Sequence, residues 1–335
     1  MYLDFYGLRE YPFSLASDPR FLYFSGGHEE AMAGLLYSLR ERKGVSLLLG
    51  EPGTGKTTLL SAVLEMLPGG VVARWLDSPL HTTPAEVLAA ILAGFGLQAP
   101  NERLSALLLC LQQYVRERHE AGECVLLVID EAQDLNPLVL EQVRLLSNLE
   151  AGGHKLLQII LSGQPELMQH LRMANGRALF QRVAVRCQLQ PLTVPETRAY
   201  VQARLEHAGA TRPLFDAEAL ARIHQLAQGI PRMINVIADH CLLAGFAAQA
   251  ERIGRPLVAK VEEQLAWELE TSHPAAIRSS APLAAPAPVP LAAAPAVAAP
   301  LTAEPAPATT QTPPVLRRFA IGWARWTGLN PREIK

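Results

Sequence analysis

The sequence has 335 residues, 49% of them hydrophobic, so it can bury the core of about two domains and is not a fully disordered chain. Its formal net charge of −2 gives no overall attraction to nucleic acid or to an anionic membrane. Its four cysteines form no C-x-x-C pair, which argues against a zinc site and a disulfide framework and favours reduced thiols in a cytosol.

The first 190 residues predict a leading segment followed by an α/β unit. Residues 1–44 are dense in aromatic side chains and end in a helix near Glu29–Arg42. Residues 45–190 then alternate short apolar runs with helical patterns, which is typical of a parallel sheet covered by helices on both faces. The strands are expected at Val45–Leu49, Val71–Leu76, Val125–Ile129, Leu156–Leu161 and Val185–Leu189. The helices are expected at Thr57–Met66, Pro84–Phe95, Leu104–His119, Leu138–Glu150 and Glu166–Met173.

The strand signal disappears after residue 190, and residues 191–270 predict a small all-helical domain. Gly229 can end one of its helices and Pro231 can begin the next, because glycine suits the residue after a helix and proline suits the first turn. The helices are expected at Pro195–Ala208, Asp216–Gln228, Pro231–Gln249 and Pro256–Glu270.

The remaining residues predict a linker and a tail. Residues 271–315 are rich in alanine and proline, a composition that cannot form a packed core. Residues 316–335 are basic and place Phe319, Trp323 and Trp326 at helical spacing, which allows either docking at a partner or membrane surface or disorder without a binding role. No apolar stretch reaches the roughly 18 residues of a membrane span, and the start lacks a signal peptide. We therefore expect a cytoplasmic protein. Its tail, residues 316–335, could contact the inner membrane peripherally.

A phosphate-binding loop is the strongest motif. Residues 50–57, GEPGTGKT, match the pattern G-x-x-x-x-G-K-[ST] between a predicted strand and a predicted helix. Small residues let backbone N–H groups close around phosphate oxygens, and the helix N-terminus adds partial positive charge. Lys56 is expected to reach the β- and γ-phosphates of a nucleotide, and Thr57 to ligate Mg²⁺. The residues expected to bind the nucleotide here are Gly50, Glu51, Pro52, Gly53, Thr54, Gly55, Lys56, Thr57 and Thr58.

Two acids end the apolar strand at Val125–Ile129. Ligands of open α/β sheets bind at the carboxyl ends of strands, where Asp130 and Glu131 are predicted to lie. Asp130 is expected to hold Mg²⁺, and Glu131 to polarise an attacking water as the catalytic base. The alternative is a solvated helix cap, a role that Asp134 or Asn136 could fill equally well.

Several segments of residues 1–270 resemble the ExeA-like family of AAA+ ATPases, typified by general secretion pathway protein A. They are the opening MYLDFYGLREYPF, the loop GEPGTGKTT, the acids IDEAQDL, and the segments SGQPEL and GIPRMIN. The resemblance implies a P-loop AAA+ core with a five-stranded parallel sheet, a small all-helical lid, and ATP and Mg²⁺ as cofactors. It also implies assembly into a homo-oligomeric ring.

The resemblance implies further site residues. A polar side chain after the fourth strand, sensor 1 of AAA+ proteins, is either Ser162 or Gln164, with Gln164 favoured. Arg177 and Arg182 are candidates for an arginine that acts on the nucleotide of a neighbouring subunit, with Arg182 favoured by position. Arg232 lies in the first turn of a helix, an unfavourable place for a cation unless a phosphate compensates it. The residues that contact adenine stay open, with His28 and the aromatic N-terminal segment as candidates.

The function expected from these features is ATP binding and hydrolysis that drives or times assembly of an envelope-associated complex. Family members act in secretion, exopolysaccharide or protein-sorting systems, so a protein partner in such a system is expected. A DNA-binding ATPase of transposition-regulator type is the weaker alternative, because DNA binding rests on basic contacts that the near-neutral charge does not favour. A P-loop kinase is disfavoured, because the adjacent acids serve attack by water.

Overall fold

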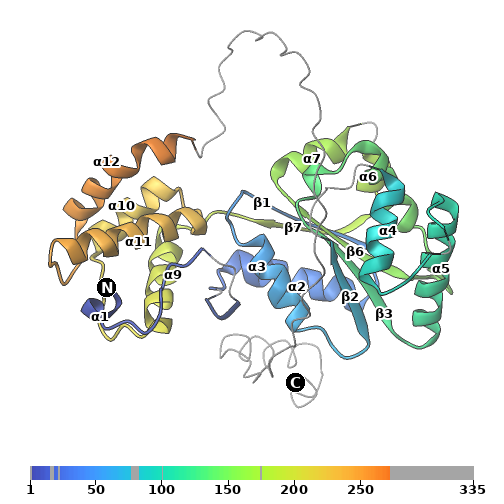
Figure 1. The fold of residues 1–335 in the computed structure, drawn as a ribbon, viewed down its shortest axis with the longest axis horizontal. Coiled ribbons are helices and arrows are strands. Elements are labelled where there is room, and N and C mark those ends of the chain that lie inside the picture. Colours follow the sequence, from blue (N-terminus) through green and yellow to red (C-terminus); the bar gives the residue numbers. More distant parts are fainter. Residues whose placement is uncertain are drawn as a thin grey trace, which may run out of the picture.

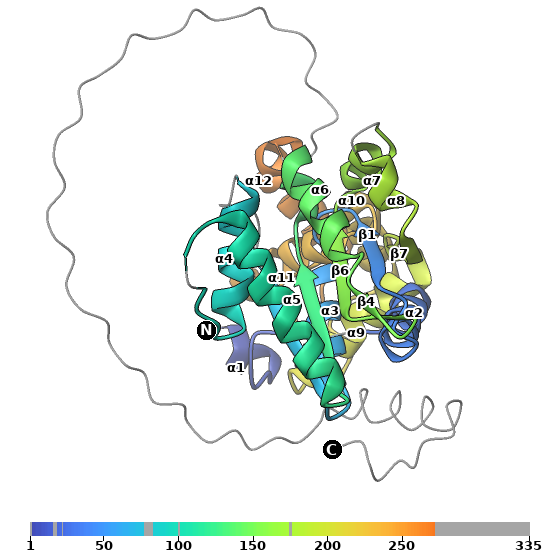
Figure 2. The same ribbon diagram turned by 90° about the vertical axis from the view of Figure 1, so that its right-hand side faces the viewer.

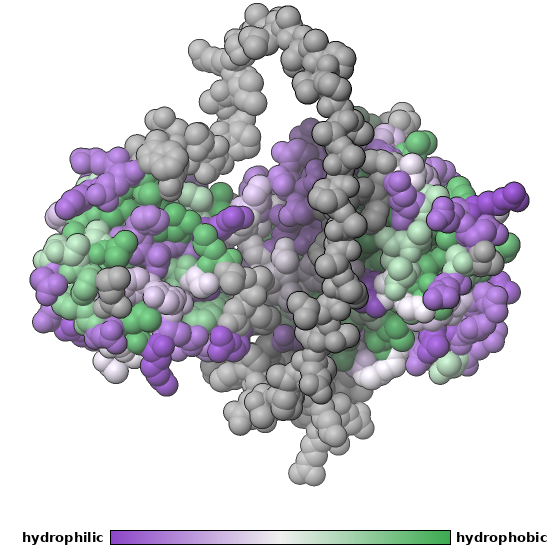
Figure 3. Space-filling view, in the orientation of Figure 1, coloured by the Kyte–Doolittle hydropathy of each residue, from purple (hydrophilic) through white to green (hydrophobic). Residues whose placement is uncertain are grey.

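The computed structural model describes residues 2–15, 19–21, 23–76, 83–99, 101–173 and 176–271. They form a lobe built on a sheet and a lobe built of helices, which lie side by side in Figure 1. The predicted tail, and the predicted linker beyond Thr271, lie outside the described residues. Hydrophilic and hydrophobic side chains are interspersed over the visible face of both lobes (Figure 3). In this part of the chain, no helix combines the length and the apolar character needed to cross a membrane.

The sheet has five parallel strands in the order β2-β3-β6-β1-β7. This arrangement confirms the predicted fold class. The central strands are buried along their whole length, which is why they read as continuous apolar runs. The strand predicted to end at Leu161 continues through Gly163, because the polar end of β6 still pairs with β1. The bounds are β1 Val45–Gly50, β2 Val71–Leu76, β3 Cys124–Ile129, β6 Leu157–Gly163 and β7 Val183–Leu189.

Helices cover both faces of this sheet. In β1, Val45, Leu47 and Leu49 face one layer of helices, whereas Leu48 faces the other, as the period of two in a strand requires. Figure 2 shows α4 and α5 on one side of the sheet and α2 on the other. One layer comprises α4 (Pro84–Gly94), α5 (Leu104–Glu120), α6 (Pro137–Leu146), α7 (Pro165–Arg172) and α8 (Arg177–Phe180), and the other α2 (Gly26–Arg40) and α3 (Lys56–Glu65).

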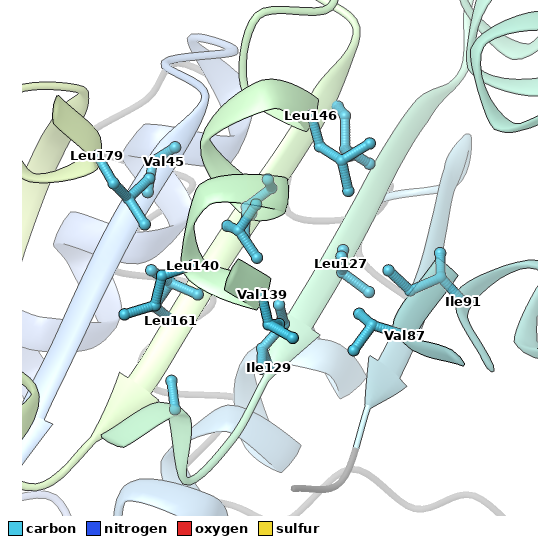
Figure 4. Close-up of a cluster of buried hydrophobic side chains, with 14 of the residues drawn as sticks. Val45, Val87, Ile91, Leu127, Ile129, Val139, Leu140, Leu146, Leu161 and Leu179 are labelled. Carbon is cyan, nitrogen blue, oxygen red and sulfur yellow. The ribbon is translucent and has the colours of Figure 1, made fainter. Parts of the chain in front are cut away.

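The larger cluster of buried side chains joins the strands to α4, α6 and α8 (Figure 4). Leu127 of β3 and Leu161 of β6 are fully buried within it, together with Val139 of α6. Each such side chain contributes about 1.5–3 kcal/mol by leaving water. The carboxyl ends of the strands, where the predicted site residues lie, are therefore held on a rigid base.

The second lobe consists of four helices, as predicted for the lid. Thr193 and Glu196 form a capping box that starts the first of them, and Pro231 occupies the first turn of the third. The bounds are α9 Val194–His207, α10 Ala217–Ala227, α11 Pro231–Ala247 and α12 Arg255–Thr271.

The N-terminal segment divides between the two lobes. A short helix that the sequence did not predict, α1 (Tyr2–Tyr6), packs in the apolar cluster of the helical lobe. The Tyr2 hydroxyl donates a hydrogen bond to Asp239, and the Tyr6 hydroxyl donates one to the carbonyl of Ala250. The chain passes through the turn η1 (Pro19–Phe21) and then enters α2 on the sheet. The described part of residues 2–24 thus packs on both lobes, with Tyr2 and Tyr6 on the helical lobe and Phe24 on the sheet lobe.

Two further elements lie where a longer helix was predicted. The helix expected at Leu138–Glu150 ends at Leu146, because the chain turns into a small antiparallel hairpin of β4 (Glu150–Ala151) and β5 (His154–Lys155). The hairpin turn uses Gly152 and Gly153, both with positive φ. Strands of two residues show no periodicity, so this hairpin left no signal in the sequence.

Candidate nucleotide-binding site

The glycines of residues 50–57 form a concave loop between β1 and α3. Gly53 and Gly55 have φ values of +81° and +98°, which residues with a side chain rarely adopt. A Cβ at Gly50 would lie 2.6 Å from Thr54 Oγ1, and one at Gly53 would lie 2.6 Å from the Cβ of Arg232. Glycine at these positions therefore lets the loop take this shape, which leaves room for a phosphate group close to its backbone.

Lys56 is the first residue of α3, and its side chain folds back over the loop. Its Nζ donates hydrogen bonds to the carbonyl oxygens of Gly50 at 2.8 Å and Glu51 at 3.3 Å. Burial lowers the pKa of the Lys56 ammonium, while the charges of Glu131 and Asp130 oppose that shift. The ammonium group thus lies within the field of both acids.

Thr57 and Asp130 meet at the start of α3 and the end of β3. The Thr57 hydroxyl donates a hydrogen bond of 2.9 Å to Asp130 Oδ2, and Asp130 Oδ1 accepts the N–H of Glu131 at 3.0 Å. Among the described residues no group of three or more His, Cys, Asp or Glu side chains could hold a metal. A hydroxyl and a single carboxylate still fit Mg²⁺, because this ion commonly takes one or two protein ligands and completes its shell with water and substrate phosphates.

Glu131 follows Asp130 in a left-handed backbone conformation, with φ of 50°. Its Oε2 accepts a hydrogen bond from Gln133 Nε2 at 2.8 Å and lies 3.5 Å from Gln164 Nε2. Ser162, the other candidate beside this acid, is fully buried, and its hydroxyl has no hydrogen-bond partner among the described residues. The structure therefore brings Gln164 to Glu131 and keeps Ser162 inside the sheet.

His28 links the loop to the start of α2 through its two ring nitrogens. Nε2 is 3.1 Å from the carbonyl oxygen of Thr54, which can only accept, so Nε2 carries the proton. Nδ1 lies 2.7 Å from the hydroxyl of Ser25, the N-cap of α2. Burial lowers the pKa of His28, which favours this neutral form. Because both nitrogens are engaged by the protein, a nucleotide base can meet His28 only through its ring carbons.

The helical lobe touches the loop directly. The backbone N–H of Arg232, in the first turn of α11, donates to the carbonyl oxygen of Gly53 at 3.2 Å. The N–H of Leu192 donates to the carbonyl oxygen of Gly229 at 2.8 Å. A Cβ at Gly229 would lie 2.2 Å from the carbonyl oxygen of Leu192. These contacts place the exposed guanidinium of Arg232 at the mouth of the loop.

An open cleft of about 350 Å³ lies between the two lobes and includes Gly53, Lys56 and Thr57. Its other wall contains a hydrogen-bonded series that the sequence did not predict: Arg204 Nη1 donates to the Tyr200 hydroxyl, which donates to Asn235 Oδ1, each at 2.8 Å. Arg204 and Asn235 are each 6% exposed. The residues that line the cleft away from the loop are Ser14, Leu15, Phe21, Tyr23, His28, Glu131, Leu192, Tyr200, Arg204, Pro231, Arg232 and Asn235.

Arg177 and Arg182 lie elsewhere. Both side chains are exposed, and Arg182 precedes Val183, which pairs with Val45 at the amino end of the sheet. A strand of seven residues spans about 20 Å, so Arg182 cannot reach the loop of its own chain.

The comparisons with known proteins concern the family and the fold. Residues 39–171 match the family model described as the AAA domain. The Cdc6p protein of Pyrobaculum aerophilum aligns over 76% of this chain and 70% of its own, with 19% identity and a TM-score of 0.59. The ORC2 protein of Aeropyrum pernix, solved as ADPNP–ADP complexes, aligns over 76% of this chain and 71% of its own, with 18% identity and a TM-score of 0.58. A Walker-type ATPase of Pyrococcus abyssi aligns over 78% of this chain and 79% of its own, with 19% identity and a TM-score of 0.53.

The fold, the glycine loop and the family model together define a P-loop ATPase of the AAA+ class. General secretion pathway protein A of Aeromonas hydrophila is 43% identical over 254 residues, which are 76% of this chain and 46% of that protein. The chain is therefore an AAA+ ATPase that resembles general secretion pathway protein A. It spans less than half the length of that relative.

Proposed function

We propose that the chain binds ATP together with Mg²⁺ and hydrolyses it. This proposal rests on the convergence of four side chains at the edge of the sheet where the strands end. Lys56 and Thr57, at the start of α3, come together there with Asp130 and Glu131, which follow β3. Bound ATP places its triphosphate in the loop of residues 50–58, where backbone N–H groups surround it. Lys56 then exchanges its bonds to the carbonyl oxygens of Gly50 and Glu51 for the β- and γ-phosphate oxygens.

Thr57 and Asp130 are the residues that would hold Mg²⁺. A bound Mg²⁺ ion neutralises negative charge on the phosphate oxygens. The hydrogen bond between the Thr57 hydroxyl and Asp130 keeps both groups in place without the ion, so little rearrangement is needed when it binds.

Glu131 is the proposed general base, and Gln164 the proposed group that orients the water. The water oxygen bonds to the γ-phosphorus, Glu131 accepts the proton that the water loses, and the bond between the γ-phosphorus and the bridging oxygen breaks to release ADP. Gln164 already lies 3.5 Å from the Glu131 carboxylate, so its amide can contact a water held there.

Arg232 is the proposed sensor of the γ-phosphate in the lid. Its side chain begins beside Gly53, and the positive end of the α11 dipole disfavours a cation there unless an anion is present. Arg182 is proposed to act on the nucleotide of a neighbouring subunit in a homo-oligomeric ring, because its place at the amino end of the sheet turns it away from its own loop.

The biological role proposed for this cycle is to drive or time assembly of an envelope-associated complex. The similarity to general secretion pathway protein A supports a secretion system, although the chain covers only part of that relative. Exopolysaccharide and protein-sorting complexes are the related settings.

A paired capture experiment tests both levels of the proposal. Phosphate release is first measured for the wild type and for Lys56→Ala, which should show no turnover. Glu131→Gln and Lys56→Ala, each immobilised with ATP and Mg²⁺, are then incubated with separated envelope and cytosolic fractions. The expected result is capture of envelope components by Glu131→Gln alone. Capture of the same proteins by Lys56→Ala, or of DNA in their place, would contradict the assembly role while leaving ATP hydrolysis intact.

A further inference from the structure

Gln133 connects the ends of two strands at the site. Its Nε2 donates to Glu131 Oε2 at 2.8 Å, and its Oε1 accepts the backbone N–H of Gln164 at 3.0 Å. Gln133 therefore uses both ends of its side-chain amide, one on the acid that follows β3 and one on the backbone that follows β6. No other residue described in the structure donates to Glu131 at so short a distance.

The backbone around Glu131 creates this contact. Residues held in the left-handed region cost of order 1–3 kcal/mol and persist only where their surroundings fix them. Here the Glu131 N–H donates to Asp130 Oδ1, and its carbonyl accepts the N–H of Asp134 at 3.1 Å. The chain turns at once into η2 (Ala132–Asp134), so Gln133 comes to lie beside the carboxylate two residues before it.

A glycine leaves room for the Gln133 amide at the end of β6. A Cβ at Gly163 would lie 2.9 Å from Gln133 Oε1 and 2.8 Å from the Cδ2 of Leu167. A Cβ at position 163 would thus require the ends of the Gln133 and Leu167 side chains to shift, and the amide would move from the N–H of Gln164. The position of the Glu131 carboxylate thus depends on the close approach of β6 as well as on its own loop.

We propose that Gln133 is a positioning residue that fixes the Glu131 carboxylate for catalysis and couples it to the strand end that carries Gln164. This inference rests on the proposed hydrolysis. A glutamate side chain has three rotatable bonds, and a general base works only when its oxygen meets the water at hydrogen-bond distance. Gln133 restricts the carboxylate without touching substrate, and it keeps Glu131 in a fixed relation to the amide of Gln164.

Two substitutions separate the two ends of the Gln133 amide. Gln133→Met removes donor and acceptor at similar length, whereas Gln133→Glu keeps the acceptor for the Gln164 N–H and loses the donor to Glu131. The matched control is Gln113→Met, because Gln113 donates to Glu117 at the same 2.8 Å on the exposed face of α5. For each protein, kcat for phosphate release, the Kd of a fluorescent ATP analogue and the thermal midpoint are measured.

Both Gln133 variants should lower kcat about 10- to 100-fold, the loss expected when a reacting group shifts by an ångström. The Kd should stay within about twofold of the wild type, since no nucleotide contact is removed. Gly163→Ala, which displaces the amide by steric contact, should give the same pattern, and Gln113→Met should change neither quantity. An unchanged kcat in Gln133→Met, or a fall in kcat matched by an equal rise in Kd, would overturn the proposal.

A spectroscopic readout tests the contact separately from turnover. The side-chain amide resonances of Gln133 are assigned by their loss in Gln133→Met and then compared between wild type and Glu131→Gln. A clear shift is expected, because the charged acceptor is replaced by a neutral amide. Absence of turnover in the wild type would refute the proposed hydrolysis, whereas unmoved Gln133 resonances would refute the positioning contact itself.

Discussion

The Thr57 hydroxyl donates a hydrogen bond of 2.9 Å to Asp130 Oδ2, and this bond joins the first turn of α3 to the end of β3. The two residues are separated by 73 positions in the chain, so only the parallel sheet brings them together. Hydroxyl and carboxylate oxygens are ligands that Mg²⁺ accepts, and their pairing holds both beside the phosphate-binding loop.

Replacing Thr57 by Val should therefore raise the Mg²⁺ concentration that turnover requires. The methyl group keeps the shape of the side chain but removes a ligand, so turnover at a fixed Mg²⁺ concentration should fall by at least about tenfold, which corresponds to about 1.4 kcal/mol. Phosphate release measured across a Mg²⁺ titration checks this. Ser61→Ala is the control, because the exposed Ser61 hydroxyl bonds only to the Thr57 carbonyl one turn away. Equal behaviour of the two variants would contradict the role of Thr57.

Comparing Gly53→Ala with Gly122→Ala should distinguish the effect of backbone strain from the effect of the contact between the phosphate-binding loop and the helical lobe. Gly53 and Gly122 share φ of +81°, but a Cβ at Gly53 would lie 2.6 Å from the Cβ of Arg232, whereas one at Gly122 meets no atom within 4 Å. Gly122→Ala should lose about 1–2 kcal/mol of unfolding free energy through strain alone. Gly53→Ala should lose more and also bind a fluorescent nucleotide at least about tenfold more weakly. Urea unfolding and nucleotide titration measure the two effects, and identical results at both positions would argue against the lid contact.

Stability should depend on pH through His28. Burial is the main cause of its lowered pKa, which the Thr54 carbonyl and the charge of Glu196 partly oppose. Because the folded pKa lies below the ordinary value of 6.5, the unfolded chain binds the proton more readily. The contribution of His28 to stability is thus complete above pH 6.5 and is lost as the pH falls from there through the folded pKa.

The free energy of unfolding, measured from pH 7.5 to 5.5, should therefore decrease less in His28→Gln than in the wild type. The slope that one such group adds cannot exceed about 1.4 kcal/mol per pH unit. His240→Gln is the control, since His240 is exposed and its Nδ1 lies 2.8 Å from the Val236 carbonyl oxygen of its own helix. A wild-type slope in His28→Gln would show that the buried imidazole does not titrate with unfolding.

Arg182→Ala should lower turnover, because it removes a group proposed to act on the nucleotide of a neighbouring subunit. The exposed Arg182 lies about 20 Å from the loop of its own chain, so the variant should bind nucleotide normally yet lose at least about tenfold in phosphate release. Mixing Arg182→Ala with Lys56→Ala should restore part of the activity, because one subunit supplies the arginine and the other an intact loop. Arg144→Ala, which breaks only an ion pair with Glu141, is the control. No recovery on mixing would argue against action between subunits.

The sequence was sufficient for the sheet and the loop because their signals are local. β3 is buried at every position, so it reads as the unbroken apolar run CVLLVI, and the acids that follow lie at the carboxyl end of the strand. The glycine loop has a fixed spacing that follows from the size of a phosphate group. Helix ends were predicted within a few residues where proline or a capping box marks them, as at Thr193 and Pro231.

The remaining parts of the site depend on contacts that no local pattern encodes. Gln133 meets the backbone of Gln164 across 31 positions, and Tyr200 meets Asn235 across 35. The short helix α1 carries aromatic residues but only five positions, too few to show a helical period. The choice between Ser162 and Gln164 likewise depends on the tertiary structure. Ser162 is buried within the sheet, whereas the side chain of Gln164 contacts Glu131.

The proposed convergence of Lys56, Thr57, Asp130 and Glu131 on one triphosphate can be tested by nucleotide retention in Glu131→Gln. The variant is incubated with ATP labelled on the γ-phosphate and with Mg²⁺, passed through a desalting column, and assayed for bound label and for free phosphate. Glu131→Gln should retain intact ATP, the wild type should release labelled phosphate, and Lys56→Ala should retain neither. Loss of all label from Glu131→Gln, or phosphate release at the wild-type rate, would contradict the convergence of these side chains on one bound triphosphate.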